Sequence, residues 1–446
     1  MPHLRHRWAP GTRSDDTGPV NGVAAGPGRP EDVLAHVGPG ADIVIPIANG
    51  EPPAVLDALE AHAGQLEGVR MHQMHALTER AYIRGEFEGH LRHVSYFLSP
   101  ATRPSYWRGT VDLVPNHFSE VPWLLAHTTK CSLVIARCSP PDRHGYVSLG
   151  TNADYTAGLI GRAPFFCEVD PQMPRTFGDN GLHLSQLAGW CEHDTPLEEL
   201  VPIEPDPADR AIAALVAERI DDRSTIQVGI GAIPNAVVDA LGGHRDLGIH
   251  TELLSDGLMR LVVAGVATGI YKHQRRNKVV TTFCLGTNEL YGWLDQNAAV
   301  DLVRVDWVND PRVIAAEPNF VSINATTEVD LMGQCASETV AGRYWSSSGG
   351  QADFARGAMY SKDGKAFIVL HSATKDLSRS RIRVSLSEGS VVTTLKNTVD
   401  HVVTEYGVAE LRGRSLRDRA QLLIGIAHPA FRDELERGAR AAGLLH

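Results

Sequence analysis

The chain has few of the features that mark disulfide-linked, zinc-binding or membrane-spanning proteins. It has only six cysteines, and they form no Cys-x-x-Cys pair and no His/Cys spacing typical of a zinc site. No apolar run is long enough to cross a membrane. These absences argue against a disulfide framework, a metal site and a membrane anchor. They favour a protein of the reducing cytoplasm.

Positive charge is also scarce. Lys and Arg number 42 against 53 Asp and Glu, which gives a formal net charge of -11 at pH 7. A nucleic-acid-binding role therefore receives no electrostatic support. Hydrophobic residues make up 43% of the sequence and charged residues 21%, which is ordinary for a globular protein. The 446 residues suffice for two or three domains of roughly 150 residues each.

Two segments suggest domain boundaries. Residues 1–30 are rich in Arg, Pro, Gly and Asp and have no apolar stretch, so we expect a disordered tail and not a signal peptide. The run Pro-Ile-Glu-Pro-Asp-Pro at 202–207 is typical of a linker. A helix is expected over 208–220, with Asp206 as its N-cap and Pro207 as its first residue. We therefore predict an N-terminal domain at 31–205 and a C-terminal domain at 206–446.

Short apolar runs alternate with helical patterns along the chain. Strands are expected at 42–46, 132–136, 225–228, 248–251, 279–284 and 366–370, and the last helix at 416–426. Such alternation favours an α/β fold with a largely parallel sheet. Residues 52–62 also match residues 234–244 at seven of eleven positions, with an offset of 182. Each copy follows an apolar strand, so a duplicated α/β unit is the better interpretation.

The second copy leads to a carboxylate. A strand at 226–228, a turn containing Gly229 and Gly231, and a helix precede the run Leu-Gly-Ile-His-Thr-Glu at 247–252. Ligands of open α/β sheets bind at the carboxyl ends of strands, so Glu252 is placed to meet a substrate. The alternative is an ordinary surface acid. The first copy has no corresponding carboxylate, which suggests that catalysis belongs to the second half.

The glycine turn before that helix allows two interpretations. Its exposed backbone N–H groups can hold a phosphate or another polar ligand group. Alternatively, Gly-Ile-Gly-Ala-Ile-Pro at 229–234 is a dinucleotide fingerprint, with Glu252 21 residues after Gly231 near the ribose-binding position. Pro234 replaces the glycine that lets helix and strand pack closely. A nicotinamide-dependent oxidoreductase therefore stays a remote alternative.

Three further motifs contain groups suited to catalysis. The turn Ser-Gly-Gly-Gln at 348–351 offers backbone N–H groups for an oxyanion hole. Glu405 follows an apolar run at 402–403 and is either a second active-site acid or a salt-bridged turn residue. His144 lies in a polar loop and has no visible Ser or Cys partner, so it is expected to be a structural residue or a substrate contact and not a general base.

Taken together, these motifs resemble the acetyl-CoA hydrolase/transferase family, which contains 4-hydroxybutyrate, butyrate and acetate CoA-transferases. The resemblance spans about residues 35–435. It is carried by Ser-Pro-Pro-Asp-Arg-His-Gly-Tyr at 139–146, Gly-Ile-His-Thr-Glu at 248–252, Gly-Gly-Gln-Ala-Asp-Phe at 349–354 and Thr-Glu-Tyr-Gly at 404–407. Further markers lie at 229–234, 309–311, 323–324, 329–334 and 380–382.

The resemblance implies two tandem NagB/RpiA/CoA-transferase-like open α/β domains and a homodimer. It also implies an enzyme that transfers CoA between an acyl-CoA and a small carboxylate by ping-pong kinetics, through a glutamyl-CoA thioester on Glu252. No permanently bound cofactor is expected, because CoA is a substrate. The implied catalytic residues are Glu252, Gly349, Gly350, Asn309 and Glu405, and the implied CoA contacts are Gly229, Ile230, Gly231, Ala232, Ile233 and Lys396.

Two positions depart from the family pattern. Relatives usually carry Gly-x-Gly-Gly-Gln, but Ser347 stands at the first glycine here, and Glu317-Pro318 stands where Asn is common. A side chain at 347 narrows the acyl pocket or shifts the turn, and its hydroxyl is able to hold a water. The main alternative is therefore an acyl-CoA hydrolase with the same glutamate. We favour transfer, because an enclosed site denies water a line of attack.

Overall fold

The computed structural model of the protein describes residues 26–446. Most of the predicted disordered tail, residues 1–30, lies outside the described residues. At its end, Gly28 pairs with Cys191, and a 3-10 helix spans Pro30–His36. The described residues therefore already include regular structure slightly before the predicted boundary at residue 31.

The first half of the chain forms a seven-stranded sheet in the order β10-β7-β5-β1-β2-β3-β4, in which every neighbouring pair is parallel. Its central strands are buried on both faces, as parallel sheets require, and this explains their continuous apolar sequences. The elements are β1 (Asp42–Ile45), α1 (Pro53–Ala61), β2 (Val69–Met74), α2 (Ala81–Arg84), β3 (Leu91–Phe97), α3 (Arg103–Arg108), β4 (Val111–Leu113), α4 (Val121–Thr128), β5 (Leu133–Cys138), β7 (Phe165–Val169) and β10 (Leu187–Glu192).

The second half forms a six-stranded sheet in the order β12-β11-β17-β22-β24-β25. All its pairs are parallel except the hairpin between β24 and β25. The elements are α5 (Pro207–Ala217), β11 (Thr225–Val228), α6 (Ala232–Ala240), β12 (Gly248–Ile249), α7 (Asp256–Val263), α9 (Val305–Val308), α10 (Pro311–Ala315), β17 (Phe320–Ala325), α11 (Gln351–Tyr360), β22 (Lys365–Val369), β24 (His401–Thr404) and β25 (Gly407–Glu410).

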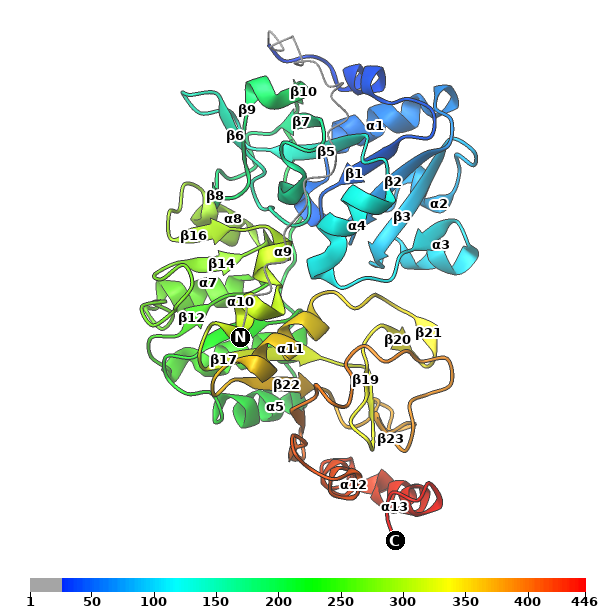
Figure 1. Cartoon of the computed structure of the whole chain (residues 1–446), viewed down its shortest axis with the longest axis vertical. Coiled ribbons are helices and arrows are strands. Elements are labelled where there is room, and N and C mark those ends of the chain that lie inside the picture. The colour runs from blue at the N-terminus through cyan, green and yellow to red at the C-terminus, as the bar shows by residue number, and fades with distance from the viewer. Residues whose placement is uncertain (1–25) are drawn as a thin grey trace, which may run out of the picture.

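The two sheets share a strand order. The sequence β2-β1-β5-β7-β10 in the first corresponds to β12-β11-β17-β22-β24 in the second. The repeated segments form α1 and α6, which follow the corresponding strands β1 and β11. The predicted fold class, with two α/β units, is therefore confirmed, and Figure 1 shows them above and below the middle of the molecule. Division of the chain at residue 206 stays a prediction, although Asp206 does cap α5 by accepting from the N–H groups of Ala208 and Asp209.

Smaller sheets join the halves. A bridge between His250 and Val280 leads from β12 to a sheet ordered β14-β16-β8, and β8 comes from the first half of the chain. The remaining elements are β6 (Tyr146–Ser148), β8 (Phe177–Gly178), β9 (Gly181–His183), β13 (Leu253–Leu254), β14 (Val279–Thr281), β15 (Phe283–Cys284), α8 (Asn288–Leu294), β16 (Val300–Leu302), β18 (Glu328–Asp330), β19 (Cys335–Ala336), β20 (Thr339–Val340), β21 (Arg343–Tyr344) and β23 (Ile382–Arg383).

The C-terminus corrects one expectation. The predicted last helix appears as α12 (Leu416–Gly425), but α13 (Arg432–Ala441) follows it at the lower end of the molecule in Figure 1. The turn at His428-Pro429 separates two helices and does not end helical structure. Leu435 and Ala439, four residues apart, bury one face of α13 in the C-terminal core, while its charged residues face outward.

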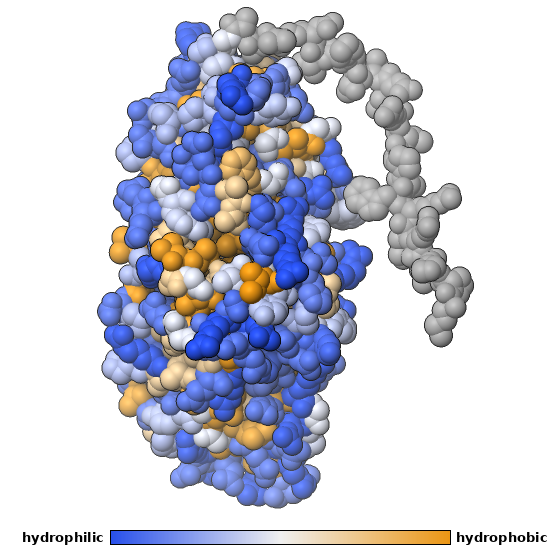
Figure 2. Space-filling view, turned by 90° about the vertical axis from the view of Figure 1, so that its left-hand side faces the viewer, coloured by the Kyte–Doolittle hydropathy of each residue, from blue (hydrophilic) through white to orange (hydrophobic). Residues whose placement is uncertain are grey.

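The surface is mainly hydrophilic on the side that carries α7 and β12, with apolar groups scattered near the middle (Figure 2). Among the described residues, no helix combines the length and the apolar character that a membrane crossing requires.

Candidate active site

Glu252 lies in the short connection between β12 and β13, and its backbone is firmly held. Its carbonyl oxygen accepts hydrogen bonds from the N–H groups of Thr282 (3.1 Å) and Phe283 (3.2 Å) and from the hydroxyl of Thr281 (3.0 Å). The preceding residues, His250 and Thr251, are fully buried. These bonds fix the backbone of Glu252 and with it the direction of its Cα–Cβ bond.

The carboxyl group of Glu252 meets two groups from distant parts of the second half. Asn309, which ends α9, donates from Nδ2 to Glu252 Oε2 at 2.7 Å. The backbone N–H of Gly350, the N-cap of α11, also interacts with the carboxyl group. The N-terminus of a helix carries partial positive charge, so α11 favours the ionised carboxylate. The structure thus brings together three of the predicted catalytic residues.

The electrostatics of Glu252 are those of a carboxyl group withdrawn from water. Burial raises its pKa from 4.5 to about 7, and the donors from Asn309 and Gly350 oppose that rise. The protein therefore holds appreciable amounts of both the carboxylate and the acid near neutral pH. A poorly solvated carboxylate is a better nucleophile than one in water.

Glycine is required at both positions of the 349–350 turn. A Cβ atom on Gly350 would overlap Glu252 Oε2 and Asn309 Nδ2. Gly349 has a φ of +55°, which strains other residues, and its Cβ would lie 3.3 Å from the ring of Phe97. Only a residue without a side chain lets this backbone approach the carboxyl group so closely.

His250 positions Asn309, a role that the sequence did not suggest. Its Nε2 lies 2.7 Å from the carbonyl oxygen of Val308, so this nitrogen carries the hydrogen and donates to it. The ring also stacks on Trp307 at a centroid distance of 5.5 Å. Burial lowers the pKa of His250 to about 3, which keeps it neutral. The residue two places before the candidate nucleophile therefore holds the helix end that presents Asn309.

Residues of the first half fasten the glycine turn from the other side. The N–H of Phe118 donates to the carbonyl oxygen of Gly349 at 3.1 Å. Ser119 donates its N–H (3.2 Å) and its hydroxyl (3.0 Å) to the carboxyl group of Asp353 in α11. Burial, with a smaller contribution from the charge of Glu252, raises the pKa of Asp353 to about 8. Sequence analysis missed Phe118 and Ser119, which lie in no recognisable motif.

A cavity of about 230 Å³ opens beside Glu252. It is lined by Phe97, Gln227, Val228, Gly229, Ile230, Glu252, Leu253, Asn324, Ala325, Ser337, Ser346, Ser347, Ser348, Gly349, Gly350 and Gln351. The predicted CoA contacts Gly229 and Ile230 therefore share a cavity with the candidate nucleophile and the glycine turn. Gly231, Ala232 and Ile233 follow directly, as the N-cap and first residues of α6, without lining it.

Two predicted site residues lie elsewhere. Glu405 follows β24 at the tip of the hairpin and accepts hydrogen bonds from the N–H (3.0 Å) and hydroxyl (2.5 Å) of Ser372. Lys396 does not line the cavity, and its carbonyl oxygen accepts a hydrogen bond from Arg419. Their roles in catalysis and CoA binding stay predictions that no contact with Glu252 supports.

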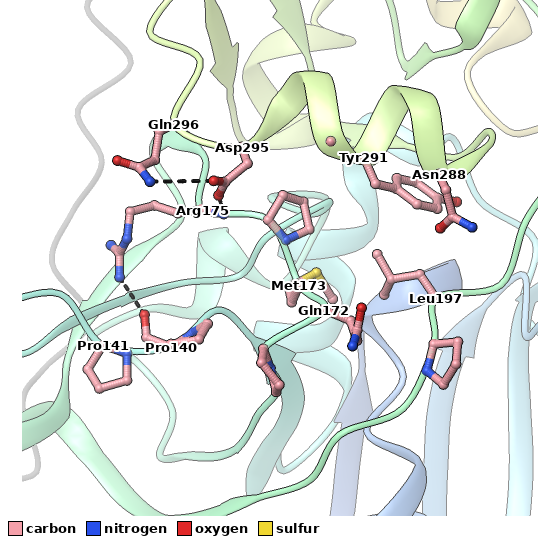
Figure 3. A pocket seen from close by; sticks show the side chains of 14 residues that line it. Pro140, Pro141, Gln172, Met173, Arg175, Leu197, Asn288, Tyr291, Asp295 and Gln296 are labelled. Carbon is pink, nitrogen blue, oxygen red and sulfur yellow. Dashed lines mark hydrogen bonds between the residues drawn. The ribbon is translucent and has the colours of Figure 1, made fainter.

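A larger cavity, of about 650 Å³, lies where α8 meets loops of the first half (Figure 3). Five prolines form much of its wall. Arg175 donates to the carbonyl oxygens of Pro140 and Tyr146, and Gln296 donates to Asp295. These polar groups already have protein partners, and no candidate nucleophile lines the cavity. Its chemistry is therefore less suited to catalysis than that of the smaller cavity beside Glu252.

Within residues 26–446, two groups of acidic and histidine side chains have the spacing of metal ligands, but both groups already contact other protein residues. In the first, Glu168, Asp170 and His193, Arg137 forms an ion pair with Asp170 at 2.6 Å. In the second, Asp206 and Asp209 cap α5, and Asp209 also pairs with His371. Neither group lies in the cavity beside Glu252.

Comparisons with known proteins agree on one family. The sequence profiles of the acetyl-CoA hydrolase/transferase N-terminal and C-terminal domains match residues 28–207 and 286–439. Succinyl-CoA:cyclohexane-1-carboxylate CoA transferase of Geobacter metallireducens is 42% identical over 92% of this chain and 94% of its own. 4-Hydroxybutyrate coenzyme A transferase of Clostridium kluyveri is 41% identical over 88% and 92%. The crystal structure of RipA from Yersinia pestis superposes with a TM-score of 0.89, at 35% identity over 94% and 97%.

Proposed function

This chain belongs to the acetyl-CoA hydrolase/transferase family and is an enzyme of CoA transfer, and we propose that it passes CoA from an acyl-CoA to a small carboxylate through a covalent thioester on Glu252. The observation that carries the proposal is the environment of this carboxyl group. It is withdrawn from water, bonded to Asn309 and Gly350, and open to a cavity. Such a group is suited to attack and not to metal binding or simple salt-bridge formation.

The first half-reaction loads CoA onto the enzyme. The Glu252 carboxylate attacks the thioester carbonyl, the C–S bond breaks, and CoA leaves as a thiolate, so that an acyl-glutamyl anhydride remains. The thiolate then attacks the glutamyl carbonyl of this anhydride. The original acyl group departs as a carboxylate, and Glu252 becomes a glutamyl-CoA thioester.

The second half-reaction runs the same steps in reverse with a new acid. The incoming carboxylate attacks the glutamyl thioester and forms a second anhydride, and the released thiolate attacks its acyl carbonyl. A new acyl-CoA leaves and the free carboxylate of Glu252 is regenerated. Since one thioester replaces another of similar energy, neither ATP nor a redox cofactor is needed. The enzyme alternates between two forms, so its kinetics are ping-pong.

Asn309 and Gly350 have a specific role in this scheme. The negative charge that develops when thiolate or carboxylate attacks the glutamyl carbonyl falls on an oxygen of Glu252 itself. The Nδ2 group of Asn309 already lies 2.7 Å from Oε2, and the Gly350 N–H faces the same carboxyl group. Donors fixed in advance stabilise such an oxyanion without reorganisation. The turn at Gly349–Gly350 thus serves as the oxyanion site.

CoA binding is assigned to the part of the cavity wall that Gly229 and Ile230 form. These residues precede the positive N-terminal end of α6, which suits a phosphate or another polar group of CoA. Binding energy from the distant nucleotide of CoA then contributes at the reacting carbon. A homodimer and a cytoplasmic location stay part of the proposal.

Two alternatives are separable from this proposal. An acyl-CoA hydrolase would use the same glutamate with water as the acceptor, and the family name covers both activities. The nicotinamide-dependent oxidoreductase gains no support, because the Geobacter and Clostridium relatives are named CoA transferases and Pro234 lies within α6.

An exchange assay tests transfer against hydrolysis. The protein is incubated with acetyl-CoA, with or without propionate or butyrate, while new acyl-CoA and free thiol are followed separately. Transfer predicts new acyl-CoA only with acceptor, parallel double-reciprocal plots, and little thiol release without acceptor. Rapid thiol release that added carboxylate leaves unchanged would assign the protein as a hydrolase. Glu252→Gln is the inactive control.

A further inference from the structure

A third cavity, of about 1060 Å³, lies where the two halves of the chain meet. Its wall is formed by α4 and the 3-10 helix before it (Phe118–Glu120) from the first half, and by α9, α10 and α11 from the second. Figure 1 shows α4 above α10 and α11. The cavity shares no lining residue with the one beside Glu252. Small-molecule sites commonly occupy roughly 300–1000 Å³, so this cavity has room for a ligand much larger than a phosphate ion.

Positive charge is concentrated around this cavity, although the chain as a whole has a formal net charge of -11. Four arginines line it against three acids. Arg312 bonds both carboxylate oxygens of Asp310 at 2.6–3.1 Å. Arg304 donates to Asp306 at 3.2 Å. Arg356, which is exposed on α11, forms no hydrogen bond or ion pair with residues 26–446, so its guanidinium group is available to an anion.

Two exposed aromatic rings lie in the same wall. Trp123 of α4 is 54% exposed, and Tyr360 at the end of α11 is 60% exposed. The ring of His127 stacks on Trp123 at a centroid distance of 4.5 Å and covers one face of the indole. His127 does not line the cavity, so the opposite face of the indole is available to a ligand. Aromatic faces of this kind bind nucleobases by stacking.

We propose that this cavity is an effector site for a nucleoside phosphate, whose base stacks on Trp123 and whose phosphate group binds Arg356. A nucleobase requires an aromatic face and a phosphate is matched by a guanidinium group, and the cavity offers both. A simple anion would use the arginine alone and leave most of the volume to water. The proposal does not depend on the reaction assigned to Glu252.

A ligand in this cavity would contact the elements that hold the active site together. Asp310, in the cavity wall, follows Asn309 directly and caps α10. Ser119, also in the wall, bonds Asp353 of α11, the helix that begins directly after the glycine turn. A nucleotide that joins α4 of the first half to α11 of the second should therefore change the geometry around the nucleophile, and with it kcat.

Calorimetry on the wild-type protein with AMP, adenosine and inorganic phosphate tests the binding site. AMP should bind more tightly than either fragment, because each fragment uses only one part of the wall. Trp123→Ala should weaken AMP binding about five- to 100-fold, through loss of one stacked base. Arg356→Ala should weaken it about 10- to 100-fold, through loss of a charged hydrogen-bond donor.

Arg437→Ala is the matched control, because Arg437 is an exposed arginine on α13 outside the cavity, and it should leave the affinity for AMP unchanged. AMP affinity that neither Trp123→Ala nor Arg356→Ala reduces would overturn the proposal. Phosphate that binds as tightly as AMP would do the same. The Glu252→Gln protein should bind AMP like wild type, so this result stands even if no covalent adduct forms on Glu252.

Steady-state kinetics separates this cavity from the CoA site, because CoA also carries a nucleotide. At saturating acetyl-CoA, AMP should change kcat by at least about fivefold, and Arg356→Ala should remove that response. The readout is acyl exchange, or thiol release if the enzyme is a hydrolase. AMP that competes with acetyl-CoA, or an Arg356→Ala variant whose KM for acetyl-CoA rises as much as its affinity for AMP falls, would assign the cavity to CoA. AMP binding without any change in kcat would refute the effector role.

Discussion

Replacing Glu252 with glutamine isolates the free-energy cost of keeping a charged carboxylate away from water. Burial raises the pKa of this group from 4.5 to about 7 in the folded protein. In the unfolded chain it titrates near its ordinary value. The folded protein therefore binds one proton more than the unfolded chain between these two pH values, and its stability falls as pH rises through that window.

The magnitude follows from the difference between the two pKa values. A shift from 4.5 to about 7 corresponds to roughly 3 kcal/mol, at 1.36 kcal/mol for each pKa unit. Below pH 4.5 both states are protonated and this cost is absent. Glutamine has the same shape, keeps an acceptor for Asn309 and carries no charge. The variant should therefore gain stability over wild type as pH rises from 4.5 to 7, and the gain should then level off.

Thermal unfolding measured from pH 4.5 to 8.5 gives the test. For a domain of 150–250 residues, 1 kcal/mol shifts the Tm by about 2–4 °C, so the expected difference at pH 8 is about 6–12 °C in favour of Glu252→Gln. Glu67→Gln, an exposed site, is the matched control for the same chemical change. A difference that does not depend on pH, or a variant that loses stability relative to wild type as pH rises, would refute the assignment of a buried, poorly solvated carboxyl group.

Two further predictions concern the groups around this carboxyl. Asn309→Ala removes a donor that lowers the pKa of Glu252, so the rise of kcat/KM with pH should shift to higher pH than its wild-type midpoint near 7. The same variant should lower kcat about 100- to 1000-fold. An unshifted pH profile would show that Asn309 does not bond the reacting carboxylate. Gly350→Ala places a Cβ atom on Glu252 Oε2, so activity should fall at least about 100-fold while the circular dichroism spectrum stays that of wild type. An active alanine variant would contradict the close approach of the Gly350 backbone to the Glu252 carboxyl group.

The sequence predicted the fold well where strands are apolar and poorly where they bury polar groups. The ranges around β1, β5 and β22 were found because central parallel strands consist mainly of apolar residues. β3 was not found: it carries His93 and Ser95, which are fully buried and break the apolar pattern.

The site was predicted mainly through the family resemblance. Asn309 and Gly350 follow Glu252 by 57 and 98 residues in the sequence, and no local pattern indicates that the three residues meet. Strand-end placement singled out both Glu252, which lines the cavity, and Glu405, which does not. β24 turns directly into the hairpin with β25, so Glu405 bonds Ser372 instead. The hydrogen bonds of Phe118 to Gly349 and of Ser119 to Asp353 depend on packing between the two halves of the chain, which no single segment of sequence specifies.

Intact mass spectrometry after incubation with acetyl-CoA alone tests the central claim most directly. The account predicts a mass increase equal to CoA minus one water, located by peptide mapping on the peptide that contains Glu252. The adduct should be absent from Glu252→Gln. After excess acetyl-CoA has been removed from the wild-type protein, added propionate should convert the adduct to free enzyme and an equal amount of propionyl-CoA. A wild-type enzyme that transfers CoA at full rate without this adduct, or that carries it on another residue, would contradict the assignment of Glu252 as the nucleophile.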